Sequence, residues 1–259
     1  MDAIPDALRQ PFVELIFSIA DDKLMLGSRN ADWTGLAPIL EEDIAFSALA
    51  QDDIAHAGAL YELIASVVGG SPDQLAFGRT PQQYRCAQLV EVSDAFDWAA
   101  ALARQFFCDH LNALRIDRLR RSCFRPAAAL AARIAAEQAL STGHADSWIV
   151  RLARGTEESR QRLDAALRKL APLTGSLFEP TEGVDRLEAA AIYPASSPPT
   201  PQAWRDRVEA LLRRAGIALS LPEPDLAAIG GRRGRHSSEF AALLDELTEV
   251  YRVEPEAAW

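Results

Sequence analysis

The stretch from Pro38 to Gly70, PILEEDIAFSALAQDDIAHAGALYELIASVVGG, decides the fold. Proline suits the first turn of a helix because an N–H group there has no intrahelical partner to lose. The Gly69-Gly70 pair at the other end is a strong stop signal. The intervening run of about 30 residues predicts a helix about 45 Å long. A helix of this length is typical of a helical bundle.

One face of this helix is apolar apart from two polar residues near its middle. At helical spacing the face reads Phe46, Leu49, Asp53, His56, Leu60, Leu63 and Val67, with Glu42 at its N-terminal extension. Buried charge is costly unless it is paired or bound to a metal. Side chains three positions apart lie on the same face, so Asp53 and His56 can reach one ion. Di-iron carboxylate bundles use a Glu-x-x-His pair on each of two helices and one carboxylate from each of the other two.

The rest of the chain also reads as helices, and no run alternates in the way a strand requires. Further helices are expected over Gln10–Ser28, Asp94–Arg121, Pro126–Gly155, a segment capped by Thr156, Gln202–Ala215 and Ser237–Arg252. Residues 71–92 read as an irregular connection, and Tyr193–Pro201 is a Pro/Ser-rich link. The pattern predicts an all-α four-helix bundle with additional C-terminal helices. We expect one domain over residues 1–259, with the core bundle at about 10–155 and a helical extension at about 156–259.

Each of the other long helices also offers an inward carboxylate, but the ligand set is incomplete. The candidates are Asp109, Glu137, and either Asp21 or Asp22 on the first helix. The residue three positions after Glu137 is Leu140, where the two-metal pattern needs histidine. His144 lies about 10.5 Å further along the axis, too far to share an ion with Glu137.

Three functional hypotheses follow from this partial set of Asp22, Asp53, His56, Asp109 and Glu137. The first is a metal-free bundle in which the polar groups hydrogen-bond one another, and the incomplete set favours it. The second is an iron-binding oxygenase that uses the Asp/His/Asp/Glu residues of the bundle. A metal-storage protein is the third, and it is disfavoured because it needs the missing second histidine.

Composition excludes several other classes of function. The formal net charge of −10 makes nucleic acid an unfavourable partner. Three cysteines without a CxxC pair predict a reducing, cytoplasmic location. The start MDAIPDALRQPF lacks a basic region before its first apolar run, so we expect no signal peptide. No apolar run reaches the roughly 18 residues of a membrane span, so no membrane association is expected.

Other motifs give little support for catalysis. GxSxG, GxGxxG and P-loop patterns are missing from the sequence. The basic segment GGRRGR, at 230–235, is interpreted as an exposed loop that docks a partner, in preference to an anion contact. His110 is expected to serve in packing or at the surface, and His236 to lie in the cap region of the last helix.

Several segments, in the same order along the chain, resemble one protein family. They are DDKLML at 21–26, Asp32-Trp33 with Gly35 and Ala37-Pro38, LEED at 40–43, ARQFFCD at 103–109, WIVRLARGTEES at 148–159, and GGRRGRHSSEFAALLDELTEVYR at 230–252 with the final Trp259. Together they resemble the structural C subunits of the bacterial phenylacetyl-CoA ring 1,2-epoxidase (phenylacetate-CoA oxygenase). The Asp53-x-x-His56 pair departs from the pattern of that family.

The resemblance implies a ferritin-like fold and an accessory role in aerobic phenylacetate catabolism. It implies a heteromer with a catalytic ferritin-like subunit of the same epoxidase, and it leaves self-association open. It places the di-iron centre in that catalytic partner, with no cofactor and no catalytic residue in this chain.

Overall fold

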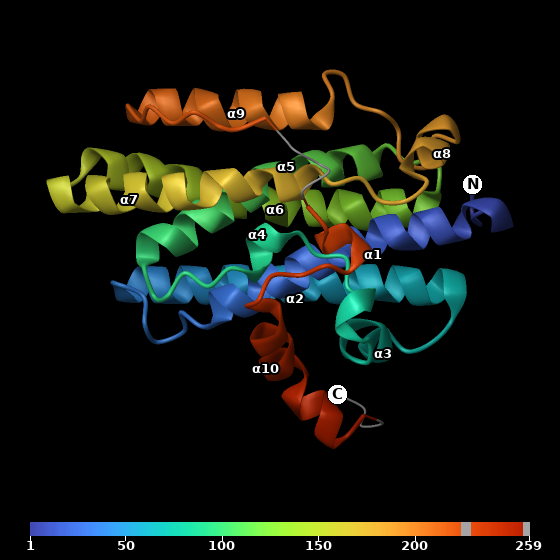
Figure 1. Cartoon of the computed structure of the whole chain (residues 1–259). Helices are drawn as coiled ribbons and strands as arrows, with labels where there is room; N and C mark the ends of the chain where they lie inside the picture. The colour runs from blue at the N-terminus through green and yellow to red at the C-terminus, as the bar shows by residue number, and fades with distance from the viewer. Residues whose placement is uncertain (224–228, 256–259) are drawn as a thin grey trace.

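The structure is a computed structural model that describes residues 1–223 and 229–255. Within these ranges all regular elements are helices, and four long ones form the bundle (Figure 1). They are α1 (Asp6–Ala31), α2 (Leu40–Val68), α5 (Trp98–Arg120) and α6 (Arg125–Arg154). Helix α1 packs along α2 and α5 along α6, and the two pairs meet through α1 with α5 and α2 with α6. This arrangement confirms the predicted all-α, ferritin-like four-helix bundle with additional C-terminal helices.

The ends of the helices follow local capping chemistry. Helix α2 stops where Gly69 takes a positive φ of 80°, as the glycine pair predicted. It begins at Leu40 and not at Pro38, because Ile39 is still extended. Helix α5 begins at Trp98, later than predicted, because the Asp97 carboxylate accepts hydrogen bonds from the first free backbone N–H groups.

The connection between α2 and α5 is more ordered than the sequence indicated. It holds three short helices, α3 (Pro72–Phe77), η1 (Pro81–Gln83) and α4 (Gln88–Glu91). The prediction of an irregular segment over 71–92 was wrong because proline occupies the first turn of both α3 and η1, where it favours a helical start.

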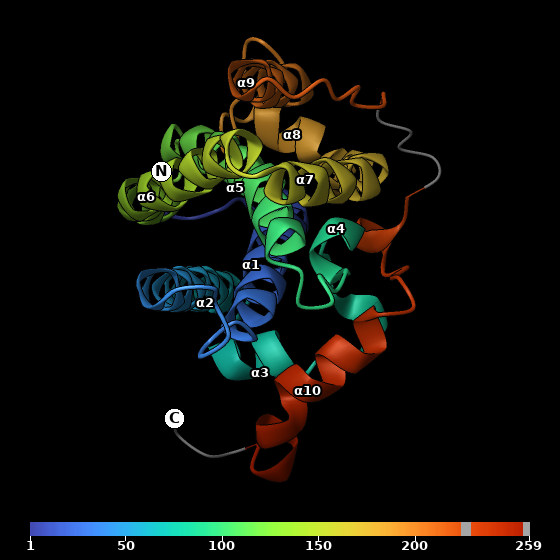
Figure 2. The ribbon, with the colours of Figure 1, turned by 90° about the vertical axis from the view of Figure 1, so that its left-hand side faces the viewer.

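The C-terminal extension covers two sides of the bundle. Its elements are α7 (Glu157–Leu170), η2 (Ala171–Phe178), α8 (Val184–Ala189), α9 (Thr200–Ala215), η3 (Gly231–Arg233) and α10 (Phe240–Val253). Thr156 caps α7 by accepting from the Ser159 N–H, as predicted. Helices α7 and α9 pack on α5 and α6, whereas α10 lies at the opposite side near α3 (Figures 1 and 2). Buried Trp204 of α9 donates its indole N–H to the Phe107 carbonyl at 2.9 Å.

A smaller aromatic cluster closes one end of the bundle. The Trp98 ring makes edge contacts with Trp33, Phe46 and Trp148, at centroid distances of 5.0, 4.8 and 5.8 Å. These rings come from the α1–α2 connection, α2, α5 and α6, so they fix how the two helix pairs meet.

Candidate functional site: a buried lysine among the carboxylates

The centre of the bundle holds a lysine ammonium between acidic and amide side chains. Lys23 of α1 is fully buried, and its Nζ donates to Asp53 Oδ1 at 2.8 Å and to Gln138 Oε1 at 2.9 Å. Asp53 is itself buried on α2. A buried carboxylate needs a partner charge, and here the ammonium supplies it.

Asp109 of α5 is connected to Lys23 through Gln138, whose side chain contacts both residues. Its carboxylate accepts from the amides of Gln105 and Gln138, each at 2.9 Å, and from the Ser141 hydroxyl at 2.5 Å. Burial, and then the Asp53 charge, raise the pKa of Asp109 to about 6. Asp53, Lys23, Gln138 and Asp109 therefore form one connected network across the bundle.

His56 and Glu137 pair at the rim of this network and not at its centre. His56 Nε2 and Glu137 Oε2 are 2.5 Å apart, and the Glu137 side chain is 46% exposed. Burial, and then the Lys23 charge, lower the pKa of His56. A second pair joins the same two helices, but here the histidine comes from α6 and the acid from α2. His144 Nε2 lies 2.7 Å from Glu42 Oε2.

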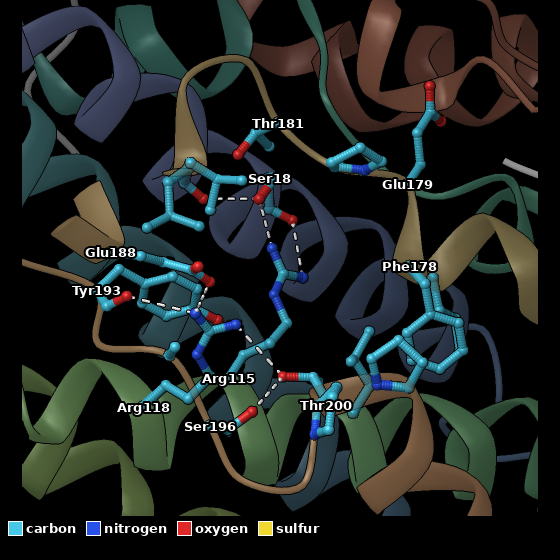
Figure 3. Close-up of a pocket in the computed structure, with 18 of the residues that line it drawn as sticks. Ser18, Arg115, Arg118, Phe178, Glu179, Thr181, Glu188, Tyr193, Ser196 and Thr200 are labelled. Atoms are coloured by element: carbon cyan, nitrogen blue, oxygen red, sulfur yellow. Dashed lines mark hydrogen bonds and ion pairs between the residues drawn. The ribbon is translucent and has the colours of Figure 1, made fainter. Parts of the chain in front are cut away.

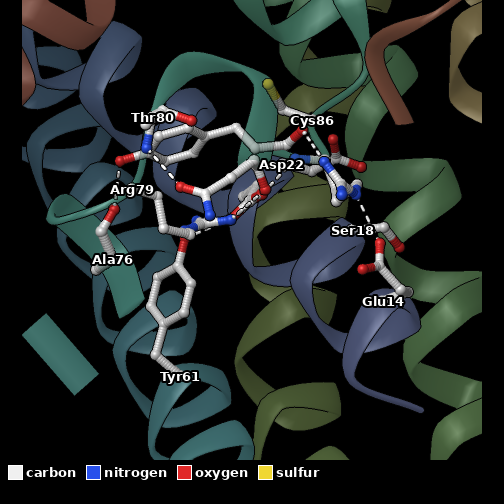
Figure 4. Close-up of polar contacts among 12 residues, drawn as sticks. Glu14, Ser18, Asp22, Tyr61, Ala76, Arg79, Thr80 and Cys86 are labelled. Carbon is white, nitrogen blue, oxygen red and sulfur yellow. Dashed lines mark hydrogen bonds and ion pairs between the residues drawn. The ribbon is translucent and has the colours of Figure 1, made fainter. Parts of the chain in front are cut away.

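Asp22 faces another part of the bundle and does not join the other candidates. Arg232 Nη1 and Nη2 donate to its two carboxylate oxygens at 2.7 and 2.5 Å, and Arg115 Nη1 donates at 2.7 Å. The Ala87 backbone N–H adds a fourth hydrogen bond at 2.7 Å. The neighbouring Asp21 is held by Arg79 and by the Tyr61 hydroxyl (Figure 4).

The segment GGRRGR is packed against the bundle at residues 230–232, so its interpretation as an exposed loop was wrong there, whereas Arg233 and Arg235 are exposed. Gly231 and Arg232 are buried, and Arg232 Nη1 also donates to the Ser18 carbonyl at 2.8 Å. A Cβ at Gly231 would collide with the Cys86 carbonyl oxygen, so the two backbones touch. The carboxylate of Asp22 accounts for this docking, because it draws the guanidinium into the interior.

The remaining histidines have structural partners. His110 is buried, with its Nε2 2.9 Å from Asp146 Oδ1 and its ring edge-on to Phe106, which agrees with the packing role expected for it. His236 lies before α10 and faces Glu91 at 2.7 Å.

A cavity of about 350 Å³ lies between α1, α5 and the segment 177–201 (Figure 3). Arg118 lines it, stacks on Tyr193 with its guanidinium carbon 3.8 Å from the ring centroid, and donates to Glu188 at 2.6 Å. The same guanidinium donates to the carbonyls of Pro194 and Tyr193. Through these contacts Arg118 holds the 188–200 segment against α5.

The residues of the central network do not fit a two-iron centre. The position that faces Asp53 and Asp109 from α6 is Gln138, and the Lys23 ammonium fills the space between Asp53 and Gln138. Three residues after Gln138 is Ser141, which donates to Asp109, and Leu140, three residues after Glu137, is 72% exposed, so neither position supplies the second histidine. A fixed cation beside the carboxylates repels a metal ion and competes for the same oxygens.

Sequence reasoning missed Lys23 and Gln138, which hold the network together. Lys23 lies on the buried stripe of the first helix, where a charged residue signals a buried partner. Gln138 directly follows Glu137, the residue predicted to face inward. An error of one position in the helical pattern is enough to place the carboxylate of Glu137 inside instead of the amide of Gln138.

In the part of the chain that the structure describes, none of the helices combines the length and the apolar character that crossing a membrane demands.

Comparison with known proteins places the chain in a family. The family described as "Phenylacetic acid catabolic protein" matches residues 1–259. The chain is also 31% identical over 243 residues to the C subunit of 1,2-phenylacetyl-CoA epoxidase from Escherichia coli (strain K12), covering 93% of this chain and 96% of that protein. A match along the whole length, together with the helical bundle, shows that the chain belongs to the phenylacetic acid catabolic protein family.

Proposed function

We propose that this chain is an accessory, non-catalytic subunit of a multicomponent ring epoxidase that acts on phenylacetyl-CoA. The similarity to the C subunit of the Escherichia coli enzyme supports the reaction and the pathway. In this proposal the di-iron centre belongs to a separate ferritin-like subunit, and this chain holds that subunit in its active assembly. The complex works in the cytoplasm, in keeping with three cysteines that are all free.

The Lys23–Asp53 ion pair is the observation that carries the proposal. Oxygen activation at two irons requires several carboxylate and imidazole ligands with open coordination positions. Here an ammonium takes up the Asp53 carboxylate, and amides surround Asp109. The alternative, an oxygenase in its own right using Asp53, His56, Asp109 and Glu137, requires Lys23 to leave that space.

An apolar surface at the start of α2 supports a partner subunit. Leu36, Leu40 and Ile44 are exposed by 58, 71 and 63%, and Ile39 lies between them at 44%. Apolar side chains gathered in this way are typical of protein–protein contacts. We name Leu36, Ile39, Leu40 and Ile44 the α2 apolar surface, and we propose that it is covered by the catalytic subunit.

The test is the iron content and activity of the chain, measured alone and after co-expression with a catalytic subunit of the same family. Elemental analysis of the purified chain from iron-replete medium is expected to give far less than one iron per chain, with no epoxidation. Co-expression is expected to give a stable complex whose epoxidation of phenylacetyl-CoA exceeds that of the catalytic subunit alone. Two irons per chain, retained after dialysis against a weak chelator, would establish the oxygenase instead.

The variant Lys23→Ala tests whether the ammonium occupies the place of a metal ion. If it does, the purified variant is expected to contain more iron than the purified wild-type chain. Lys169→Ala, which changes an exposed lysine of α7, is the matched control. Failure of the wild-type chain to associate with any catalytic subunit of the family would refute the accessory role.

A further inference from the structure

Three metal-ligating side chains, two from one short segment and one from a distant part of the sequence, meet beneath the C-terminal extension. Cys86 precedes α4, Glu91 ends α4, and His236 follows the docked 230–235 segment. Their ligand atoms lie within 4.8 Å of one another. Cys86 and Glu91 are fully buried, and the His236 side chain is only 6% exposed.

We propose that Cys86, Glu91 and His236 bind one divalent zinc ion, which links the C-terminal extension to the connection between α2 and α5. This site is separate from the Lys23 network and independent of the epoxidase assignment. Nitrogen, sulfur and oxygen ligands of this kind are those that zinc prefers in proteins. Three protein ligands leave the fourth tetrahedral position to a water molecule.

Two of the three distances between the ligand atoms are close to those of a tetrahedral site. Zinc–ligand bonds of about 2.3 Å to sulfur and about 2.0–2.2 Å to nitrogen and oxygen place a tetrahedral sulfur about 3.5–3.7 Å from the other ligand atoms, and nitrogen and oxygen about 3.3–3.5 Å apart. Cys86 Sγ is 3.5 Å from Glu91 Oε1 and 3.8 Å from His236 Nδ1. The imidazole and carboxylate are 2.7 Å apart, so this one separation must open by about 0.6–0.8 Å on the same geometry.

Neighbouring groups already orient two of the ligands. The Ser237 backbone N–H donates to Glu91 Oε2 at 2.7 Å, which leaves Oε1 directed towards Cys86 and His236. The Phe240 ring stacks on the His236 imidazole at a centroid distance of 3.8 Å. Such outer contacts fix the direction in which metal ligands point.

The charges also balance. Without a cation the Cys86 thiol donates its proton to the Glu91 carboxylate, with Sγ 3.5 Å from Oε1. A zinc ion displaces that proton and takes the Nδ1 lone pair of His236. One thiolate, one carboxylate and one divalent cation then sum to zero, which suits a buried site.

The competing interpretation is a metal-free cluster in which Glu91 accepts hydrogen bonds from the thiol, the imidazole and the Ser237 N–H. Cobalt(II) titration of the full-length chain, stripped with a chelator, distinguishes the two. Zinc-type sites with a cysteine ligand give an intense near-ultraviolet thiolate-to-cobalt band. We expect that band to saturate at one cobalt per chain and to disappear when zinc is added.

Matched variants assign the band to these residues. Cys86→Ser keeps a hydroxyl that can donate to Glu91, and it is expected to abolish the band and weaken zinc binding more than about 100-fold. His236→Gln is expected to weaken binding similarly. Cys123→Ser and His110→Gln, which change a thiol and a buried imidazole outside the cluster, are expected to leave both measurements unchanged.

Thermal unfolding gives a second readout that does not depend on the variants. Added zinc is expected to raise the melting temperature of the wild-type chain, because an ion bound only to the folded state stabilises it. Wild-type chain without the cobalt band and without this shift would overturn the proposal. A band that survives Cys86→Ser but is lost in Cys123→Ser would overturn it equally.

Discussion

The Lys23 ammonium and the Asp53 carboxylate lie 2.8 Å apart inside the bundle, on adjacent helices, with both side chains removed from water. Gln138 gives the ammonium a second acceptor, while Asp53 Oδ2 has no protein hydrogen-bond partner among the described residues. Lys23 therefore supplies the positive charge that compensates for the burial of the Asp53 carboxylate.

Removal of the lysine charge alone is expected to destabilise the fold strongly. Lys23→Met leaves Asp53 buried and unpaired, a change that costs about 3–5 kcal/mol in the free energy of unfolding. Urea unfolding followed by circular dichroism measures it. Lys169→Met on the surface of α7 is expected to stay within about 0.5 kcal/mol of wild type.

Removal of both charges is expected to recover most of that loss. The double variant Lys23→Met/Asp53→Leu replaces the ion pair by apolar groups, which is often neutral for a buried pair. A double variant as unstable as Lys23→Met would show that Asp53 has a structural role besides pairing with Lys23.

Asp109 is expected to make the stability depend on pH. Its folded-state pKa of about 6 lies above the ordinary value of 3.8, so the folded chain holds this proton more tightly than the unfolded chain does. The resulting stabilisation is complete below pH 4 and is lost as the pH rises through about 6. The shift corresponds to about 2–3 kcal/mol.

The variant Asp109→Asn is expected to remove this dependence. Its gain over wild type should approach about 2 kcal/mol at pH 7.5 and vanish near pH 4, measured by urea unfolding at each pH. Asp117→Asn, on the exposed side of the same helix, serves as the control and should lack this pattern. Equal pH profiles for Asp109→Asn and wild type would mean that Asp109 titrates normally.

Gly231 is expected to be intolerant of any side chain. Its Cβ would overlap the Cys86 carbonyl oxygen, so Gly231→Ala must separate the docked segment from the bundle, at about 1–3 kcal/mol. Gly143 of α6 has open space around it, and Gly143→Ala is expected to stabilise the helix by about 0.5–1 kcal/mol. Thermal unfolding of the two alanine variants should therefore shift in opposite directions.

The α2 apolar surface is expected to control assembly and not folding. Ile44→Asp places a charge on exposed apolar area, so it should weaken association with a catalytic subunit at least about tenfold while the melting temperature changes little. Gln51→Asp, elsewhere on the exposed side of α2, is the control. Unaltered association of Ile44→Asp would place the partner on another face.

The sequence predicts the bundle well because long helices with strong stops leave few alternatives. Gly69-Gly70 and Thr156 act through their own backbone chemistry, which is local and readable. The side chains inside the bundle are harder to predict, because whether Glu137 or Gln138 faces inward depends on a rotation of about 100° per residue. The guanidinium partners of Asp22 could not be predicted, since they come from α5 and from η3 near the other end of the chain.

That last contact sets the order in which the chain can complete its structure. Asp22 and Arg232 are separated by 210 positions, so on the ribosome the acid emerges long before its bidentate partner is synthesised. Its other guanidinium partner, Arg115, lies 93 positions after it. Closing so long a loop is slow in comparison with local helix formation. A chain that ends before Arg232 therefore lacks two of the four hydrogen bonds that the Asp22 carboxylate accepts in the complete structure.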